Sequence, residues 1–418
     1  MLNLTKAERE KFLHHTTSVE VTARVTDGEN KITVYTEENI LMDSLEITSS
    51  ICDSQEFVFG GCIATKCVLQ LINVPNHNWT DNKIEIIFVF SYMDQLYPNK
   101  GLYPSKVLYP KERKIVSKTF HMFTGTIDSA KRLSNNRNVV ELTAYDYMYK
   151  LSNISIYNYV EGVAQHSPTA LVLSDIREYI TDSVLKERFG ILSGSFSGLN
   201  DSKHLEFYID NVESVMNDKT SCADMLSAYC ELNCCFAYFD NIGVLRFKML
   251  PTYRDNSCET VQEYSTLTFE DFVTADINKL KLRYNKNEYS EINSGNDKES
   301  WYVSDNIITS CFATKTYITS MLNGFRNNLD HFEYLTNTAM FGNQISYRPY
   351  EMELFSYWWL TPGDKVTIQT GFDNDWDIKE FDSYVFSKSI KGINGFKTTI
   401  SAQGVEKLGK DEVTYNVQ

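Results

Sequence analysis

Proline and glycine are scarce in this sequence, with 8 Pro and 19 Gly among 418 residues. Both counts fall below ordinary usage, which excludes collagen-like and low-complexity chains. Hydrophobic residues make up 42% and charged residues 23%, so a disordered chain is also excluded. At this length we expect roughly two to four domains, because single cores rarely exceed about 250–300 residues.

Basic charge is also in short supply. The chain has 40 Lys and Arg against 55 Asp and Glu, a formal net charge of −15. Nucleic acids and anionic membranes are bound through basic residues that neutralise phosphates, so specific binding to either is disfavoured. Residues 111–118 hold several Lys and Arg, but the surrounding sequence dilutes this cluster.

No segment has the pattern of a membrane span or a signal peptide. The N-terminus carries charges where a signal peptide needs an apolar core. The most apolar stretch, residues 84–93, contains Glu85 and is about half the length of a membrane helix. We therefore expect a soluble protein made in the cytosol, without stable membrane insertion.

Catalytic and cofactor motifs are missing from the sequence. It has no phosphate-binding loop, Rossmann fingerprint, nucleophile elbow or His-Glu-x-x-His motif. The nine cysteines are irregularly spaced, which is typical of reduced, buried thiols. Cys230 and Cys234 lie four residues apart near Cys222, but no Cys-x-x-Cys pair supports a zinc site. The sequence thus predicts no catalytic residues, no cofactor and no metal.

Two acidic patterns have alternative interpretations. Residues 373–377 (Asp-Asn-Asp-Trp-Asp) resemble the start of a calcium loop, but Ile378 and Tyr384 stand where an EF-hand needs Gly and Glu. We favour a solvated hairpin tip. Glu351 and Glu353 share one face of an expected strand and could serve glycoside hydrolysis, although a solvated face accounts for them better.

What the sequence has in excess is aromatic residues, 13% in all, which favour strands and large buried surfaces. Residues 19–25, 32–35 and 139–144 alternate at period two, with turn chemistry between them, so residues 18–153 predict a barrel or sandwich. The residues before them are polar and helical, like an arm outside that core.

The period changes to that of helices near residue 166. Ser167-Pro168 begins one expected helix, and Ser221 with Asp224 has the spacing of a capping box for a second. A hairpin follows at residues 235–248, with its turn at 240–243. Residues 293–304 read as a polar loop, and strands return, clearest between Lys365 and Ala402.

The predicted fold is therefore mainly β with an α+β insert. We expect five parts: an N-terminal arm (1–17), a first β domain (18–153), an α+β domain (154–250), a connecting mixed domain (251–344), and a second β domain with the C-terminal tail (345–418).

One aromatic cluster is a candidate subunit interface, although a place in the core accounts for it equally well. A carbohydrate-stacking platform would use similar residues. The cluster consists of Phe355, Tyr357, Trp358 and Trp359.

Three stretches resemble hub proteins from the baseplates of tailed bacteriophages and related contractile injection particles. The first runs from Asp43 to Ile47 and on through Phe59-Gly60-Gly61 to Ala64. The second joins Phe123-Thr124-Gly125-Thr126 to Ala144-Tyr145-Asp146, and the third joins Trp359 and Pro362-Gly363-Asp364 to Ala402-Gln403-Gly404. Their order and spacing span nearly the whole chain.

This resemblance implies a structural virion component without enzymatic activity. It implies a homotrimer whose subunits each place two β-barrel-like hub domains around an axial channel. Such a hub adapts the hexameric tail tube to a threefold spike or fibre, so the expected partners are the tail tube protein, a spike or tail-fibre protein, and the tape measure protein. The resemblance also implies assembly in the bacterial cytoplasm and residence in the virion.

Some relatives carry a fused peptidase or lysin domain after the hub region. Because this sequence ends at Gln418, soon after the third motif, we expect none here. The alternative from another class is a tail-tip protein that binds carbohydrate or degrades cell walls, with Tyr357, Trp358 and Trp359 as its stacking platform and an unidentified Asp/Glu pair for catalysis.

Overall fold

The computed structural model of the chain describes most of its residues, and every structural statement below concerns these. They are residues 4–41, 43–52, 57–75, 78–94, 114–133, 138–166, 171–194, 206–207, 217–232, 235–250, 258–274, 279–284, 288–293, 301–304, 346–370, 378–392 and 397–406.

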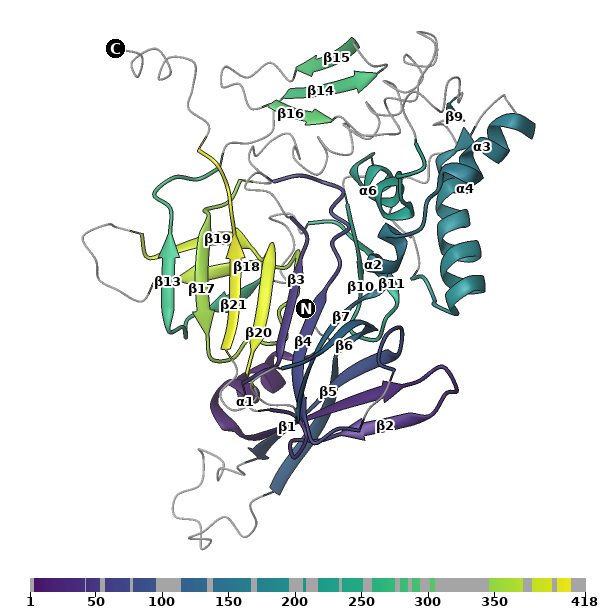
Figure 1. Cartoon of the computed structure of the whole chain (residues 1–418). Coiled ribbons are helices and arrows are strands. Elements are labelled where there is room, and N and C mark those ends of the chain that lie inside the picture. Colours follow the sequence, from purple (N-terminus) through teal and green to yellow (C-terminus); the bar gives the residue numbers. More distant parts are fainter. Residues whose placement is uncertain are drawn as a thin grey trace, which may run out of the picture.

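A single sheet of 11 strands forms the centre of the fold (Figure 1). Its order is β13-β17-β21-β20-β3-β4-β7-β6-β5-β1-β2. The strands are β1 (Thr16–Thr26), β2 (Ile32–Tyr35), β3 (Glu46–Ser50), β4 (Lys66–Ile72), β5 (Lys83–Asp94), β6 (Lys114–Arg132), β7 (Val139–Tyr145), β13 (Thr266–Phe269), β17 (Tyr350–Leu354), β20 (Ser387–Lys391) and β21 (Lys397–Ala402). The strands expected at 19–25, 32–35, 139–144 and 397–402 are all present.

Strands from the first and last parts of the sequence meet inside this sheet. β20 pairs antiparallel with β3, in a register that places Ser387 opposite Ser50 and Lys391 opposite Glu46. We call β1 to β7 the N-terminal lobe, and β13, β17, β20 and β21 with the small sheet over them the C-terminal lobe. Since the end strands β13 and β2 are not paired with each other in the described part of the chain, the sheet is open.

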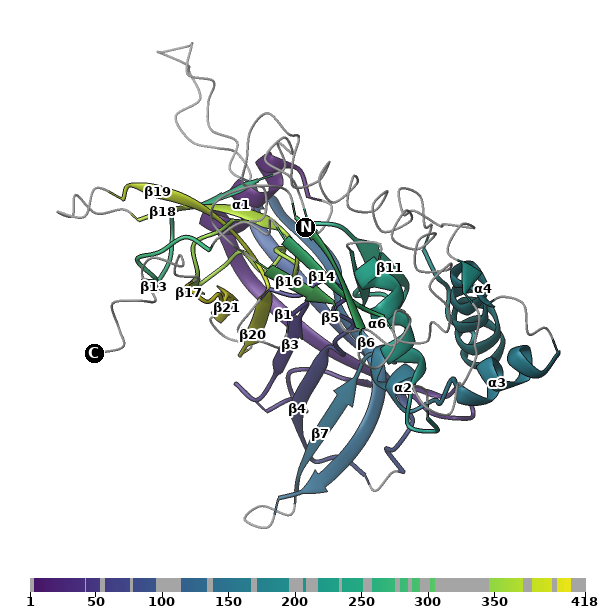
Figure 2. The same ribbon diagram turned by 90° about the horizontal axis from the view of Figure 1, so that it is seen from above.

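The small sheet gives the C-terminal lobe a second layer (Figure 2). It has the order β12-β18-β19 and consists of β12 (Glu259–Val261), β18 (Lys365–Gln369) and β19 (Glu380–Tyr384). Phe381 of β19 lies 5.3 Å from Phe269 of β13 and 6.3 Å from Tyr350 of β17, between ring centroids. The lobe is thus a small sandwich with an aromatic interior.

Helices and a hairpin form the insert between the lobes, and Figure 1 places them together beside the N-terminal lobe. The elements are α2 (Tyr147–Ser152), α3 (Tyr157–His166), β8 (Leu171–Val172), α4 (Leu173–Glu178), the π-helix η1 (Tyr179–Arg188), β9 (Glu206–Phe207), α6 (Cys222–Leu232), β10 (Phe236–Phe239) and β11 (Leu245–Lys248).

The expected capping box of α6 is confirmed. Ser221 N donates to Asp224 Oδ2 at 2.9 Å, and Asp224 N donates to Ser221 Oγ at 3.1 Å. The hairpin of β10 and β11 is also confirmed, with a turn in which Asp240 N donates to Val244 O and Gly243 has a φ of 83°. The helix expected from Ser167-Pro168 differs: residues 167–170 lie outside the described residues, 171–172 are a strand, and the helix begins at Leu173.

Another three-stranded sheet lies at the top of Figure 1. It contains β14 (Lys279–Tyr284), β15 (Glu288–Asn293) and β16 (Trp301–Ser304), in the order β15-β14-β16. The prediction of a polar loop at 293–304 is wrong at both ends, because Asn293 belongs to β15 and Trp301–Ser304 pairs parallel with β14. Residues 294–300 lie outside the described residues. The prediction of a mainly β fold with an α+β insert is confirmed. Among the described residues, no helix has the length and apolarity to span a bilayer.

The N-terminal helix α1 (Lys6–His15) has the predicted structure but not the predicted position. Its Phe12 is 2% exposed and meets the rings of Phe90 and Tyr92 of β5 edge to face. Burying one large aromatic side chain is worth about 2–3 kcal/mol, which fixes the helix on the sheet. Through Phe12 the helix is therefore packed on the core, rather than being an arm outside it.

The aromatic cluster at 355–359 divides between core and surface. Trp358 is 2% exposed and stacks on Phe90 at 4.1 Å and 9°, with Phe120 of β6 and Phe12 of α1 at 4.7 and 5.4 Å. Tyr357 and Trp359 are equally buried, whereas Phe355 is 65% exposed. Three of the four candidate interface residues thus belong to this chain's own core, and only Phe355 remains available to a partner.

Replacing Trp358 with Ala removes the ring that joins the C-terminal lobe to α1, β5 and β6. We expect the free energy of unfolding in urea, followed by circular dichroism, to fall by about 3–5 kcal/mol. Phe355→Ala in the same connection is the matched control, with an expected change within about 0.5 kcal/mol. Equal losses for the two variants would contradict this assignment.

Candidate functional site

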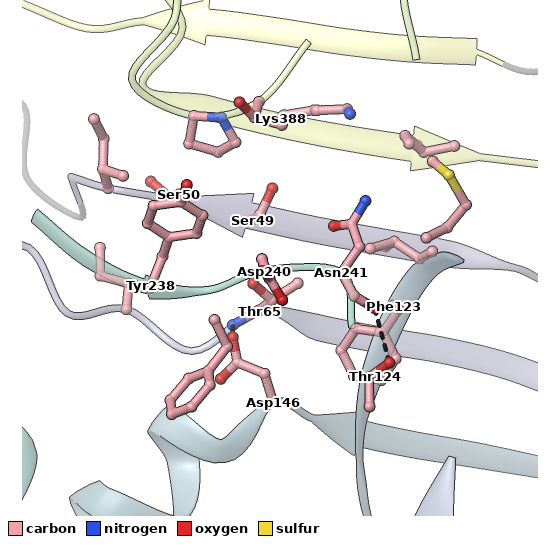
Figure 3. Close-up of a pocket in the computed structure, with 18 of the residues that line it drawn as sticks. Ser49, Ser50, Thr65, Phe123, Thr124, Asp146, Tyr238, Asp240, Asn241 and Lys388 are labelled. Atoms are coloured by element: carbon pink, nitrogen blue, oxygen red, sulfur yellow. Dashed lines mark hydrogen bonds between the residues drawn. The ribbon is translucent and has the colours of Figure 1, made fainter. Parts of the chain in front are cut away.

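The three motif segments converge on one cavity of about 330 Å³ between the two lobes and the hairpin of the insert (Figure 3). We call this region the motif junction. Its lining includes residues of the first motif segment (Ile47, Ile51, Ile63), the second (Phe123, Thr124, Asp146) and the third (Thr361, Pro362), with Tyr238, Asp240, Asn241, Lys248 and Lys388 beside them.

Asp146, from the second motif segment, is a buried N-cap. Its Oδ1 accepts from Met148 N of α2 at 3.0 Å, and its Oδ2 accepts from Thr65 N at 2.9 Å. The backbone is joined as well, because Asp146 N donates to Thr65 O at 3.0 Å. The side chain is 2% exposed, and this burial raises the pKa of Asp146 to about 7, against the opposing effect of the two amide bonds. The carboxyl therefore connects α2 to the segment before β4.

Gly125 and Thr124 of the same motif segment hold β6 against its neighbours. A Cβ at Gly125 would lie 2.2 Å from Tyr145 O, so β6 and β7 approach here more closely than any side chain permits. Thr124 Oγ1 donates to Asn241 O at 2.8 Å, the bond that ties the hairpin turn of the insert to β6 (Figure 3).

The Pro-Gly-Asp turn of the third motif segment is an ion-paired joint between the C-terminal lobe and the insert. Gly363 has a φ of 81°, which the turn requires, and Asp364 Oδ2 accepts from Thr361 N at 2.7 Å. Lys248 of β11 donates to Asp364 Oδ1 at 2.7 Å and to Pro362 O at 3.0 Å. Burial acts to raise the pKa of Asp364, but the Lys248 ammonium contributes to holding it below the ordinary value.

Lys388 of β20 lies on the buried side of its strand, at 7% exposure. Its Nζ donates to Trp358 O at 2.6 Å and to Leu360 O at 2.5 Å. Burial lowers the pKa of Lys388 to about 7, although the charge of Asp364 acts in the opposite direction. The lysine thus satisfies two buried carbonyls of the connection that carries Trp358.

The Phe-Gly-Gly segment of the first motif holds the N-terminal lobe on the insert. Gly60 has a φ of 84°, and a Cβ there would lie 2.5 Å from Ser227 O of α6. A Cβ at Gly61 would lie 1.9 Å from Ile51 O. Gly60 N donates to Cys235 O at 3.0 Å. These glycines are therefore required by close backbone approach rather than by any chemistry.

The polar groups of the motif junction are used to join segments. Asp146 accepts from backbone amides, Lys388 donates to backbone carbonyls, and Lys248 pairs with Asp364. No group of three or more His, Cys, Asp or Glu in the described residues is arranged to hold a metal ion. The arrangement is that of a structural joint.

The acidic patterns of the sequence occupy other places. Residues 373–377 lie outside the described residues. Glu353 Oε1 pairs with Lys397 Nζ at 2.9 Å and accepts from Ser265 Oγ at 2.9 Å, bonds that lower the pKa of Glu353. A lowered pKa keeps this carboxylate ionised, which is unsuited to the general acid of a glycosidase.

Sequence reasoning singled out the aromatic cluster and missed Asp146, Lys248 and Lys388 as joint residues. Asp146 and Asp364 stand at the ends of the Ala-Tyr-Asp and Pro-Gly-Asp motifs, so the motifs themselves carried a signal. Lys388 had no such signal, because a lysine in a strand that alternates with polar residues is expected to face solvent.

No protein-family model matches this chain, and no curated protein matches it. Solved structures do resemble it. The 43 kDa tail protein of prophage MuSo2 from Shewanella oneidensis is 10% identical over 92% of this chain and 96% of its own, with a TM-score of 0.47. A tail protein from Neisseria meningitidis is 10% identical over the same shares, with a TM-score of 0.48.

A third structure is an E. coli protein described as a component of the type VI secretion system with structural similarity to two T4 bacteriophage tail proteins. It is 9% identical over 88% of this chain and 74% of its own, with a TM-score of 0.38. At these identities the similarities concern the fold alone.

The titration of Asp146 predicts a pH dependence of stability. Because its folded pKa is raised to about 7, the folded protein retains a proton that the unfolded chain releases near pH 4. This contribution is full below about pH 4 and is lost as the pH rises to about 7. Between these values wild type should lose about 2–4 kcal/mol relative to Asp146→Asn, measured by urea unfolding at each pH.

The amide side chain of the Asp146→Asn variant would keep the acceptor for Met148 N and lose the bond from Thr65 at every pH. The test therefore compares how the free energy of unfolding changes with pH, rather than its absolute value. Asp27→Asn, at a surface turn where the carboxylate also accepts backbone amides, is the control. Parallel pH profiles for wild type and Asp146→Asn would show that Asp146 is not the titrating group.

Lys388 offers a second test of the joint. Lys388→Met preserves side-chain length but leaves Trp358 O and Leu360 O without their donor, at an expected cost of about 1–3 kcal/mol in unfolding free energy at pH 8. Lys391→Met on the same strand removes a lysine whose side chain is 57% exposed and paired with Glu46, so its expected cost is below about 1 kcal/mol. A larger loss at Lys391 than at Lys388 would refute the role of the buried lysine.

Proposed function

We propose that this chain is a structural subunit of a phage tail or tail-like particle, namely the homotrimeric baseplate hub that adapts the hexameric tail tube to a threefold spike or fibre. The observation that supports this most directly is the motif junction. The three segments that resemble hub proteins lie far apart in the sequence and meet around one cavity. The three resemblances therefore concern one structural unit rather than three unrelated segments.

The fixed arrangement of the two lobes is compatible with a ring of three chains. β3 and β20 fix the N-terminal and C-terminal lobes side by side in one sheet, so a single chain presents two β lobes at a constant spacing. Three such chains would present six β lobes, which is the number a hexameric tube must meet. A rigid joint is needed, because lobes that moved independently could not match a fixed tube.

The charge of the chain suits an axial channel. DNA must pass through such a channel without binding, and a net charge of −15 repels phosphate rather than holding it. In this proposal acidic residues of the two lobes line the channel, and the insert projects toward the spike or fibre. The chain acts by shape alone, without catalysis, in particles assembled in the bacterial cytoplasm.

The carbohydrate-binding alternative loses its main support. Tyr357, Trp358 and Trp359 were its stacking platform, and all three are at most 2% exposed. A sugar ring needs an exposed aromatic face, and only Phe355 of this cluster has one. A subunit contact at Phe355 remains part of the hub proposal.

The hub proposal predicts a threefold assembly. The purified chain, co-expressed with the tube and spike proteins of its particle, should give a core complex with three copies of the 48.2 kDa chain in light scattering, and threefold symmetry in electron microscopy. Phe355→Glu should weaken this assembly at least about tenfold, because a buried interfacial aromatic is replaced by a charge.

Leu192→Glu is the matched control, since Leu192 is a comparably exposed residue, at 63%, on the insert. It should leave the trimer unchanged. A complex with one, two or four copies, or loss of turbidity when the chain is added to bacterial cell walls, would overturn the proposal.

A further inference from the structure

Three thiols come together where the N-terminal lobe meets the insert. The thiol of Cys230 in α6 interacts with the thiols of both Cys62, which follows Gly60-Gly61, and Cys235, which directly precedes β10. None of the seven cysteines in the described residues is in a disulfide. Cys230 and Cys235 are buried, whereas Cys62 is half-buried.

Backbone contacts on both sides fix this cluster. Gly60 N donates to Cys235 O at 3.0 Å, and Ala237 N donates to Gly61 O at 3.2 Å, so the segment before Cys62 is attached to β10. The close approach of Gly60 to Ser227 O attaches the same segment to α6, which packs beside β10 (Figure 1). Cys235 N also donates to Cys230 O at 3.0 Å. The backbone on both sides of the three thiols is therefore held by hydrogen bonds and close packing.

We propose that Cys62 and Cys230 form a disulfide when the protein meets an oxidising environment, cross-linking the N-terminal lobe to the insert. The structure supplies both thiols, and a small-molecule disulfide such as oxidised glutathione supplies the oxidant. The proposal concerns a modification of the chain itself and does not depend on the hub function.

The reaction proceeds by two thiol–disulfide exchanges. The Cys62 thiolate attacks one sulfur of oxidised glutathione, forming a mixed disulfide and releasing one glutathione thiolate. The Cys230 thiolate then attacks Cys62 Sγ, forming the Cys62–Cys230 bond and releasing the second glutathione thiolate. The two protein thiols lose two electrons and two protons, and one oxidised glutathione becomes two reduced glutathiones.

The order of attack follows from exposure. Cys62 is the most exposed residue of the cluster and therefore reacts with the oxidant first, whereas the buried Cys230 is the resolving thiol. Burial raises the pKa of Cys230 well above its ordinary value, and the neighbouring thiols of Cys235 and Cys62, the titratable groups that act on it, do the same. Little of it is thiolate at neutral pH, so closure is slow and accelerates with pH.

The test uses the full-length chain, first reduced and then incubated with oxidised glutathione. Peptide mapping without reductant should find Cys62 linked to Cys230, and the intact mass should fall by two hydrogen atoms. Below the pKa of Cys230 the thiolate fraction grows tenfold per pH unit, so closure should accelerate about tenfold per unit between pH 7 and 9. The melting temperature should rise by about 2–5 °C.

Single variants separate this pair from the other thiols. Cys62→Ser should abolish the cross-link, while Cys235→Ser should retain it. Cys52→Ser removes another half-buried thiol from the same region and should also retain it, which makes it the matched control. A glutathione adduct that persists on Cys62, a link that survives Cys62→Ser, or a closure rate independent of pH would overturn the assignment.

Discussion

The stacking of Trp358 on Phe90 is the contact on which the arrangement of the two lobes depends. Trp358 comes from the connection after β17, and its ring lies among side chains of α1, β5 and β6. Lys388 holds the same connection through the carbonyls of Trp358 and Leu360. An apolar ring and a buried amine thus act on one short segment, and together they fix where β20 meets β3.

Buried polar groups determine how the lobes and the insert are placed relative to one another. Apolar contacts tolerate sliding, whereas a buried carboxylate or amine must find particular partners, because an unpaired buried group costs about 1–3 kcal/mol. Asp146 fixes α2 against the segment before β4, and Lys248 with Asp364 fixes β11 against the turn before β18. Each pair joins segments distant in sequence, so the insert and the lobes have one relative placement.

Much of the local structure could be predicted from the sequence. Ser221 and Asp224 marked the start of α6, and the residues around Asp240 and Gly243 marked the hairpin, because caps and turns depend on a few neighbouring side chains. The aromatic run at 355–359 was recognised as either core or interface. Local pattern could not decide between them, since the answer lies in Phe12, Phe90 and Phe120, which are more than two hundred residues away.

The candidate site was less predictable than the fold. The β20 sequence Ser-Lys-Ser-Ile-Lys alternates like a strand with one polar face, yet Lys388 shares the buried side with Ile390. Tyr357 adopts a φ of 61°, which no aromatic residue favours and no sequence rule anticipates. The burial of Lys388 depends on carbonyls of a segment about thirty residues away, which a local pattern does not contain.

The partnership of β3 with β20 has a consequence for synthesis. The edge of β3 emerges from the ribosome early, and its neighbour in the finished sheet is made more than three hundred residues later. Since the ribosome adds about 5–20 residues per second, the amides and carbonyls of that edge remain without their β20 partners for at least about fifteen seconds. Nascent chains of this protein are therefore exposed to mispairing and to chaperone capture for longer than a protein whose strands pair in order of synthesis.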